Sequence, residues 1–131
     1  MPVVDASVLV EYVGGGEHVD VARSYLMADR GALWAPHLVD AEVGHALRRM
    51  VAAGDIRPHA ARAGLKDLAE MPLQRAPHRG LMDRAWALRE NVSFYYGLYL
   101  ALAEALEAPL LTLDTRLAGV PGTCANVLVI A

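Results

Sequence analysis

Two apolar runs in the chain lead into an aspartate. Val3 and Val4 precede Asp5, and residues 110–113 precede Asp114. Glu42 lies between them in the sequence, on a predicted helix and at the border of its apolar stripe. Carboxylates that are brought together repel one another, and they stay ionised together when a divalent cation neutralises them. Mg²⁺ and Mn²⁺ prefer such hard oxygen ligands, so a pocket of these acids would suit metal-assisted phosphodiester hydrolysis.

The same acids also have an ordinary structural interpretation. An aspartate after a strand often caps a helix or closes a turn, and Glu42 would suit a first helical turn because the helix dipole favours acids there. Asp40 is two residues from Glu42, about 200° around a helix, and is expected to face elsewhere. His45 is three residues from Glu42 and could share its face, although a surface position is commoner. Residue types and spacing leave both interpretations open.

The elements that would position these acids alternate between strands and helices. Continuous apolar runs predict strands at residues 3–5, 32–35, 73–76, 110–114 and 127–130. Apolar residues at helical spacing predict helices at residues 8–13, 17–30, 38–53, 58–70, 81–90 and 95–107. This alternation indicates an α/β three-layer domain with a mostly parallel central sheet flanked by helices. Ligands of such sheets bind beyond the carboxyl ends of the strands, where both aspartates are expected.

Composition limits the class of protein. The chain has 131 residues, of which 55% are apolar, and a net charge of −3. These values favour one folded domain over residues 1–131 and exclude a disordered chain or a strongly basic wrapper of nucleic acid. The lone Cys124 allows no intramolecular disulfide, and no basic leader precedes Asp5, so a cytoplasmic location is expected. Glu104, Glu107 and Pro109 interrupt the longest apolar stretch, which argues against a membrane span.

Several segments together resemble the PIN-domain ribonucleases, and specifically the VapC-type toxins of bacterial toxin–antitoxin pairs. The matching segments, which keep the family's order over essentially the whole chain, are residues 3–10, 36–43, 98–106 and 110–117. The resemblance implies a PIN-like fold and a metal-dependent endoribonuclease. It also implies that Asp5, Glu42 and Asp114 hold Mg²⁺ or Mn²⁺ as metal ligands and catalytic residues.

The resemblance implies further roles and partners. Ser7 and Thr112 would orient the carboxylates, although a helix N-cap and an ordinary strand threonine explain them equally well. Arg116 is the arginine best placed to bind RNA, because it follows Asp114. The expected partners are an RNA substrate, a small cognate antitoxin protein and a second copy of the chain. Exposed apolar positions for such a homodimer are Tyr25, Met27 and Val51.

One position departs from the family pattern. The family usually has an aspartate at the start of the long apolar helix, and Tyr96 stands at that position here. A phenol with a pKa near 10 is a poor Mg²⁺ ligand at neutral pH, so weak metal binding and slow RNA cleavage are expected. An alternative is a catalytically weakened PIN domain that acts as a protein-binding module. A third possibility is an α/β hydrolase with Asp5 as nucleophile, but no lysine motif supports it.

Overall fold

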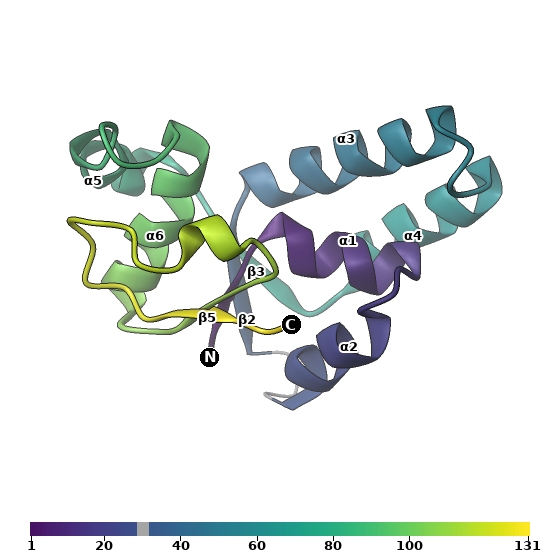
Figure 1. Ribbon diagram of the computed structural model, residues 1–131, viewed down its shortest axis with the longest axis horizontal. Helices are drawn as coiled ribbons and strands as arrows, with labels where there is room; N and C mark the ends of the chain where they lie inside the picture. The colour runs from purple at the N-terminus through teal and green to yellow at the C-terminus, as the bar shows by residue number, and fades with distance from the viewer. Residues whose placement is uncertain (29–31) are drawn as a thin grey trace.

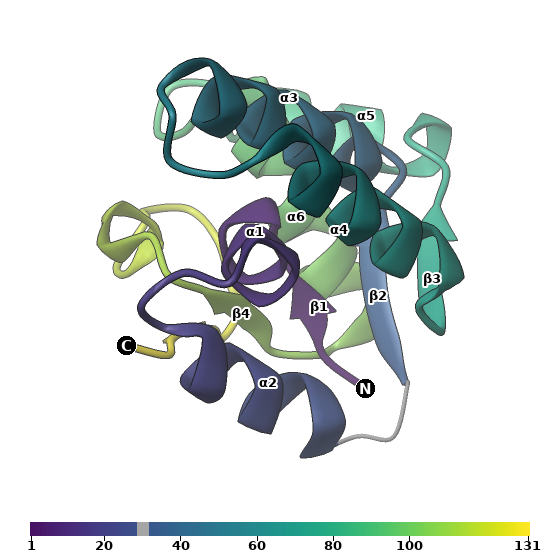
Figure 2. The same cartoon turned by 90° about the vertical axis from the view of Figure 1, so that its right-hand side faces the viewer.

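A five-stranded parallel sheet forms the centre of the structure, a computed structural model that describes residues 1–28 and 32–131. Its strands are β1 (Val3–Val4), β2 (Leu33–Pro36), β3 (Leu73–Ala76), β4 (Leu110–Thr112) and β5 (Val127–Val129). The order across the sheet is β3-β2-β1-β4-β5 (Figures 1 and 2). Val3 pairs with Leu110 and Val4 with Leu111, so the carboxyl ends of β1 and β4 lie side by side.

Helices cover this sheet and complete the predicted three-layer α/β fold. One group consists of α1 (Ala6–Gly14), α2 (Val19–Ala28), α3 (Leu38–Ala52) and α4 (Pro58–Glu70), in which α1 contacts each of the others. A second group consists of α5 (Met82–Ala87) and α6 (Phe94–Leu106), which pack against each other, with α6 against β1, β2 and β4. Figure 1 shows the two groups on opposite sides of the view. Within the described ranges, none of the helices is long and apolar enough to cross a membrane.

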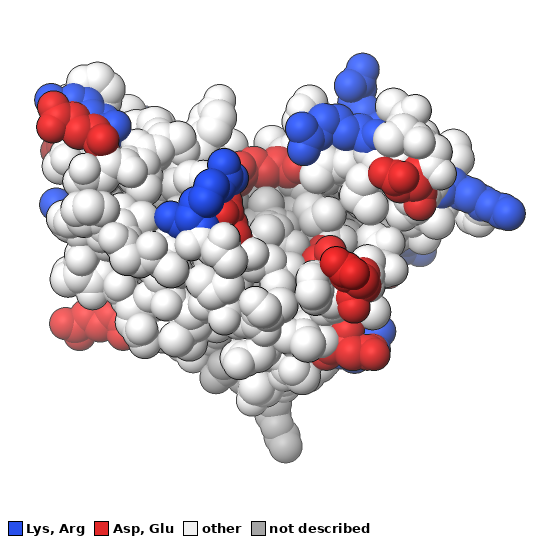
Figure 3. Space-filling view, viewed as in Figure 1, with Lys and Arg blue, Asp and Glu red and all other residues white. Residues whose placement is uncertain are grey.

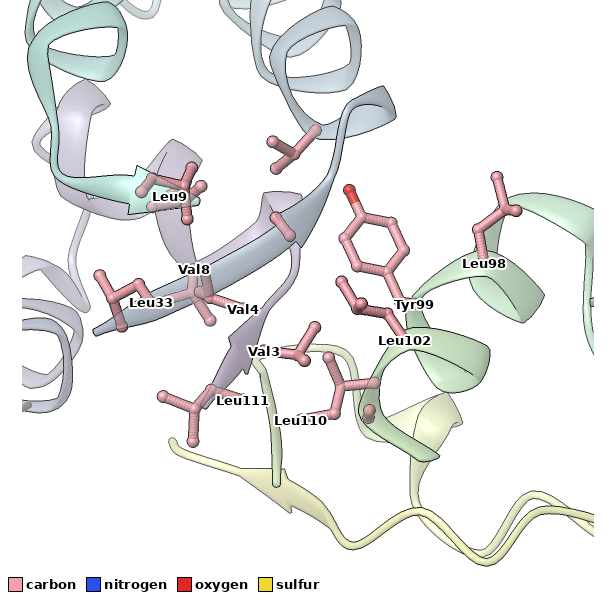
Figure 4. Packing of buried hydrophobic residues seen from close by; sticks show 14 of the residues in the cluster. Val3, Val4, Val8, Leu9, Leu33, Leu98, Tyr99, Leu102, Leu110 and Leu111 are labelled. Atoms are coloured by element: carbon pink, nitrogen blue, oxygen red, sulfur yellow. The ribbon is translucent and has the colours of Figure 1, made fainter. Parts of the chain in front are cut away.

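The apolar runs became strands because both faces of the sheet are covered. Val3, Val4 and Leu110 are fully buried. Helix α6 is apolar on most of its circumference and is correspondingly buried from Gly97 to Ala103. Figure 4 shows the Tyr99 ring between α6 and the sheet, with its hydroxyl directed away from α6.

Several predicted boundaries differ from the structure. The helix predicted at residues 81–90 is a 3₁₀ turn (Arg79–Leu81) followed by α5, which ends at Ala87. The helix ends there because the Leu88 amide donates a hydrogen bond to the Ala85 carbonyl, which tightens the last turn. The Leu88 side chain, which is only 1% exposed, packs in the core. The helix predicted at residues 17–30 is present as α2, which begins two residues later than predicted, at Val19, and is described up to Ala28; its predicted end lies outside the described residues.

Candidate active site

Asp5 follows β1 and is held from two directions. Its Oδ1 accepts hydrogen bonds from the Ser7 amide (3.1 Å), the Ser7 hydroxyl (2.5 Å) and the Val8 amide (3.4 Å). Its Oδ2 accepts a hydrogen bond from the Thr112 hydroxyl at 2.5 Å. Asp5, rather than Ser7, is therefore the N-cap of α1. With 3% of its surface exposed and both oxygens engaged, Asp5 is poorly placed to act as a nucleophile.

Ser7 and Thr112 connect the ends of β1 and β4. The Ser7 hydroxyl accepts a hydrogen bond from the Leu113 amide at 2.9 Å, and the Thr112 hydroxyl accepts one from the Asp114 amide at 2.9 Å. Both hydroxyls also donate to Asp5. The two residues therefore orient Asp5 and fix the chain that leads to Asp114, as a supporting role requires.

Asp114 lies two residues beyond β4 and is paired with a cation of its own chain. It caps the 3₁₀ turn Thr115–Leu117 by accepting a hydrogen bond from the Arg116 amide. The Arg116 guanidinium donates to Asp114 Oδ2 at 2.7 Å and to Oδ1 at 3.0 Å. The Tyr96 hydroxyl donates to Oδ2 at 2.7 Å. The hydrogen bonds from Arg116 and then Tyr96 hold the pKa of Asp114 well below its usual range.

Glu42 lies on α3 and meets a residue that the sequence did not single out. The Tyr99 hydroxyl donates to Glu42 Oε1 at 2.6 Å. Tyr99 is three residues after Tyr96 on α6, so the two phenols share one side of that helix. That spacing was the available signal, but an aromatic residue in so apolar a helix is ordinarily core. Asp40 faces elsewhere, as predicted, and accepts two hydrogen bonds from Arg75.

The two tyrosines tie the three acids to one region. Burial, reinforced by Asp114 and to a lesser degree by Asp5, raises the pKa of Tyr96 to about 12. Burial, reinforced by Glu42 and then Asp5, raises the pKa of Tyr99 above its usual range. Hydrogen bonds supply the spatial links: Tyr96 contacts Asp114, and Tyr99, one turn later on α6, contacts Glu42. Asp5 is joined to the start of the Asp114 loop through Thr112, so the three acids are connected near the carboxyl ends of β1 and β4.

A cavity of about 600 Å³ opens beside this region. We call it the cleft, and its lining includes Ser7, Glu42, His45, Arg49 and Tyr95. The three residues from α3 follow helical spacing, so one side of that helix faces the cleft. His45 therefore lines the cleft while remaining exposed at its surface. Figure 3 shows acidic side chains around the hollow at the centre of this face, with basic side chains at its edges.

Among the residues that the structure describes, no cationic side chain forms an ion pair with Asp5 or Glu42. Burial raises the pKa of both carboxyls, and the opposing hydrogen bonds come from hydroxyls and, at Asp5, backbone amides. Hard oxygen donors whose charge is partly or fully removed from water and is not compensated by a cation fit a divalent ion. Within residues 1–28 and 32–131, however, no three acids, histidines or cysteines are grouped closely enough to hold a metal. The donor chemistry fits, whereas Asp114 is held by Arg116 and Tyr96.

Comparisons with known proteins agree on one family. The family model described as PIN domain matches residues 3–122. The protein named Ribonuclease VapC1 from Mycobacterium tuberculosis is 48% identical over 122 residues, which cover 92% of this chain and 90% of that protein. Ribonuclease VapC9 from the same organism is 39% identical over 118 residues, covering 89% of this chain and 88% of that protein.

Solved structures share the fold at lower sequence identity. A toxin–antitoxin complex from Klebsiella pneumoniae aligns with a TM-score of 0.70 at 18% identity, covering 98% of this chain and 96% of that chain. VapBC2 from Rickettsia felis, bound to a DNA fragment from the promoter, aligns with a TM-score of 0.71 at 14% identity, covering 96% of both chains.

Proposed function

Because the chain belongs to the PIN-domain family, we propose that it is the endoribonuclease toxin of a toxin–antitoxin pair and that it hydrolyses RNA phosphodiester bonds at the acids beside the cleft. The observation that carries this proposal is the buried Asp5 carboxylate, held by Ser7 and Thr112 at the end of the sheet. The relatives are named as ribonucleases, which favours an enzyme over the protein-binding module considered above.

The proposed cofactor is Mg²⁺ or Mn²⁺, held by Asp5, Glu42 and Asp114. Support comes from the buried charge of Asp5 and the half-buried charge of Glu42, neither of which has an ion-pair partner among the described residues, and from the hard oxygen donors that all three residues supply. When bound, such a cation supplies Lewis acidity toward a phosphoryl oxygen and a neighbouring water.

The chain's own side chains would prepare the site for this chemistry. Ser7 and Thr112 keep Asp5 in one rotamer and, by donating hydrogen bonds, favour its ionised form. Tyr99, on α6, likewise donates a hydrogen bond to Glu42 and favours its ionised form. Arg116, whose side chain is 78% exposed, would contact a phosphate of the RNA. Preorganised carboxylates reduce the rearrangement that binding and catalysis require.

RNA cleavage by matched variants tests this function. Asp5→Asn and Glu42→Gln each remove one charge with little change of shape, and each should lower the cleavage rate by on the order of 100-fold or more. Asp67→Asn, an exposed acid on α4, is the control and should cleave like the unaltered chain. Addition of a chelator should stop cleavage, and Mg²⁺ or Mn²⁺ in excess should restore it. Full activity of Asp5→Asn would exclude the proposed site.

The proposed partners are a small antitoxin and a second copy of the chain. The antitoxin is supported by the similarity to chains from toxin–antitoxin complexes. The homodimer is supported by exposed apolar side chains, which include the predicted Tyr25 and Met27 and also Trp86, with Met82 and Phe94 around a hollow of about 390 Å³. Light scattering of the isolated chain should show a dimer at micromolar concentration, and a monomer there would contradict this part of the proposal.

A further inference from the structure

Asp114, an acid of the proposed metal site, is neutralised by an ion pair with Arg116 of the same chain. The guanidinium donates to both carboxylate oxygens, at 2.7 Å to Oδ2 and 3.0 Å to Oδ1. The Tyr96 hydroxyl occupies Oδ2 as well and accepts a further hydrogen bond from Arg116 at 3.2 Å. Arg116, Tyr96 and Asp114 thus form a closed triad, which we call the latch.

The latch divides the site into two unequal parts. Asp5 is buried and Glu42 half-buried, and in the described part of the chain the hydrogen-bond donors to both carboxylates are uncharged. Asp114 already has a full positive charge against it. A divalent cation approaching Asp5 and Glu42 meets unpaired negative charge, whereas one approaching Asp114 must displace a guanidinium and a phenol.

The latch is built so that it can open. The Arg116 side chain is 78% exposed, and an ion pair with one exposed partner is worth little in water and exchanges readily. Tyr96 is half-buried on the first turn of α6, beside the cleft-lining Tyr95. Opening therefore requires the exposed Arg116 side chain to rotate away and the Tyr96 hydroxyl to release Asp114 Oδ2, with no change in the sheet.

We propose that Arg116 is a resident counter-ion that keeps Asp114 out of the metal site until a divalent cation displaces it, with Tyr96 fixing the closed geometry. This inference rests on the proposed function, because it concerns the same site. Displacement frees the guanidinium for a phosphate of the RNA. The latch thereby lowers the affinity of the site for the free metal ion.

Calorimetric titration of the full chain with Mn²⁺ tests the latch without measuring activity. The variants are Arg116→Gln, Asp114→Asn and the two combined, with Arg84→Gln as a matched control. Arg84 forms a similar two-pronged ion pair, with Glu104, outside the proposed site. Circular dichroism and thermal melting of each variant establish that it is folded.

The latch predicts a specific pattern of affinities. Arg116→Gln should bind Mn²⁺ about twofold to fivefold more tightly, which is the range expected when a competing exposed ion pair is removed. Asp114→Asn should eliminate that gain, because Arg116 and Mn²⁺ then no longer compete for a carboxylate at position 114. Arg84→Gln should bind as the unaltered chain does. An equal gain in the Asp114→Asn background would show a general charge effect and would overturn the latch, as would unchanged or weaker binding by Arg116→Gln.

Asp5→Asn separates failure of the latch from failure of the proposed function. If Asp5→Asn loses Mn²⁺ binding while Arg116→Gln leaves it unchanged, only the latch is wrong. If Asp5→Asn binds Mn²⁺ as well as the unaltered chain does, the metal site itself is wrong, and the latch with it.

Discussion

Replacing Tyr96 with aspartate tests how this chain departs from its family. Tyr96 is half-buried and packs against the core, and its hydroxyl donates to Asp114 at 2.7 Å. Tyr96→Asp removes that hydrogen bond to a charged group, worth about 1.5–3 kcal/mol. It also places a second carboxylate beside Asp114, although Arg116 compensates part of the repulsion. Without metal, we therefore expect a loss of about 2–3 kcal/mol in the free energy of unfolding.

A divalent cation should reverse this loss in the variant. A ligand at 100 times its dissociation constant stabilises the folded state by about 2.7 kcal/mol, and one present at its dissociation constant by only about 0.4 kcal/mol. An additional carboxylate should tighten Mg²⁺ binding, since Mg²⁺ is held mainly by charged oxygen donors. Saturating Mg²⁺ should then bring Tyr96→Asp close to the stability of the unaltered chain, which itself should respond weakly.

Urea denaturation with chelator and with Mg²⁺ measures both effects, and RNA cleavage measures the gain in activity. Tyr96→Asn is the control, because it makes nearly the same change of shape and removes the same hydroxyl, which contacts Asp114 and Arg116, without adding a charge. It should lose stability without metal, and Mg²⁺ should not restore it.

Two results would refute this reasoning. A loss above about 5 kcal/mol that Mg²⁺ leaves unchanged would mean that position 96 is core, where an unpaired charge is expensive. Equal RNA cleavage by the unaltered chain and Tyr96→Asp, abolished in both by Asp5→Ala, would mean that the phenol is no handicap.

The remaining predictions concern stability away from the chemistry. Gly64→Ala should lower the free energy of unfolding by about 1–3 kcal/mol, because its Cβ would lie 2.8 Å from a backbone oxygen of α1. Gly44→Ala, whose Cβ would meet nothing closer than 3.8 Å, should instead raise it by about 0.5–1 kcal/mol, and urea denaturation compares the two. Glu104→Gln should lower stability by about 1–2 kcal/mol at neutral pH, since the carboxylate accepts charged and neutral hydrogen bonds. Those bonds lower the pKa of Glu104, so its contribution exists above the ordinary pKa of 4.5 and is lost as the pH falls through the lowered value. A Glu104→Gln deficit that grew as the pH fell below 4.5 would contradict this. His78→Ala should lower the free energy of unfolding by about 1 kcal/mol, because His78 Nε2 accepts a hydrogen bond from the Leu38 amide at the start of α3. Thermal melting measures this loss, and an unchanged melting temperature would show that the hydrogen bond contributes nothing to stability.

Local sequence patterns determined the layers of the fold. The continuous apolar runs are the five strands, because strands buried on both faces need apolar residues at successive positions. The helices were predicted from apolar residues at helical spacing, because each buries one stripe of its surface. The same periodicity separated Glu42 from Asp40, which turned out to bind Arg75 on another side of α3. Periodicity did not determine where α5 ends, since the turn at Leu88 depends on a core contact rather than on helix propensity.

The tertiary structure decided how the acids are held. Ser7 and Thr112 meet at Asp5 across more than 100 residues only because β1 and β4 are neighbours in the sheet, and strand order has no local signature. The contact of Tyr99 with Glu42 joins α6 to α3 in the same way. The sequence alone could place a carboxylate at Asp114 and a cation two residues later. The sequence does not say whether the Arg116 side chain points to solvent, where RNA could bind, or pairs with Asp114. In the structure it contacts Asp114 and Tyr96, because a short 3₁₀ turn brings donor and acceptor together.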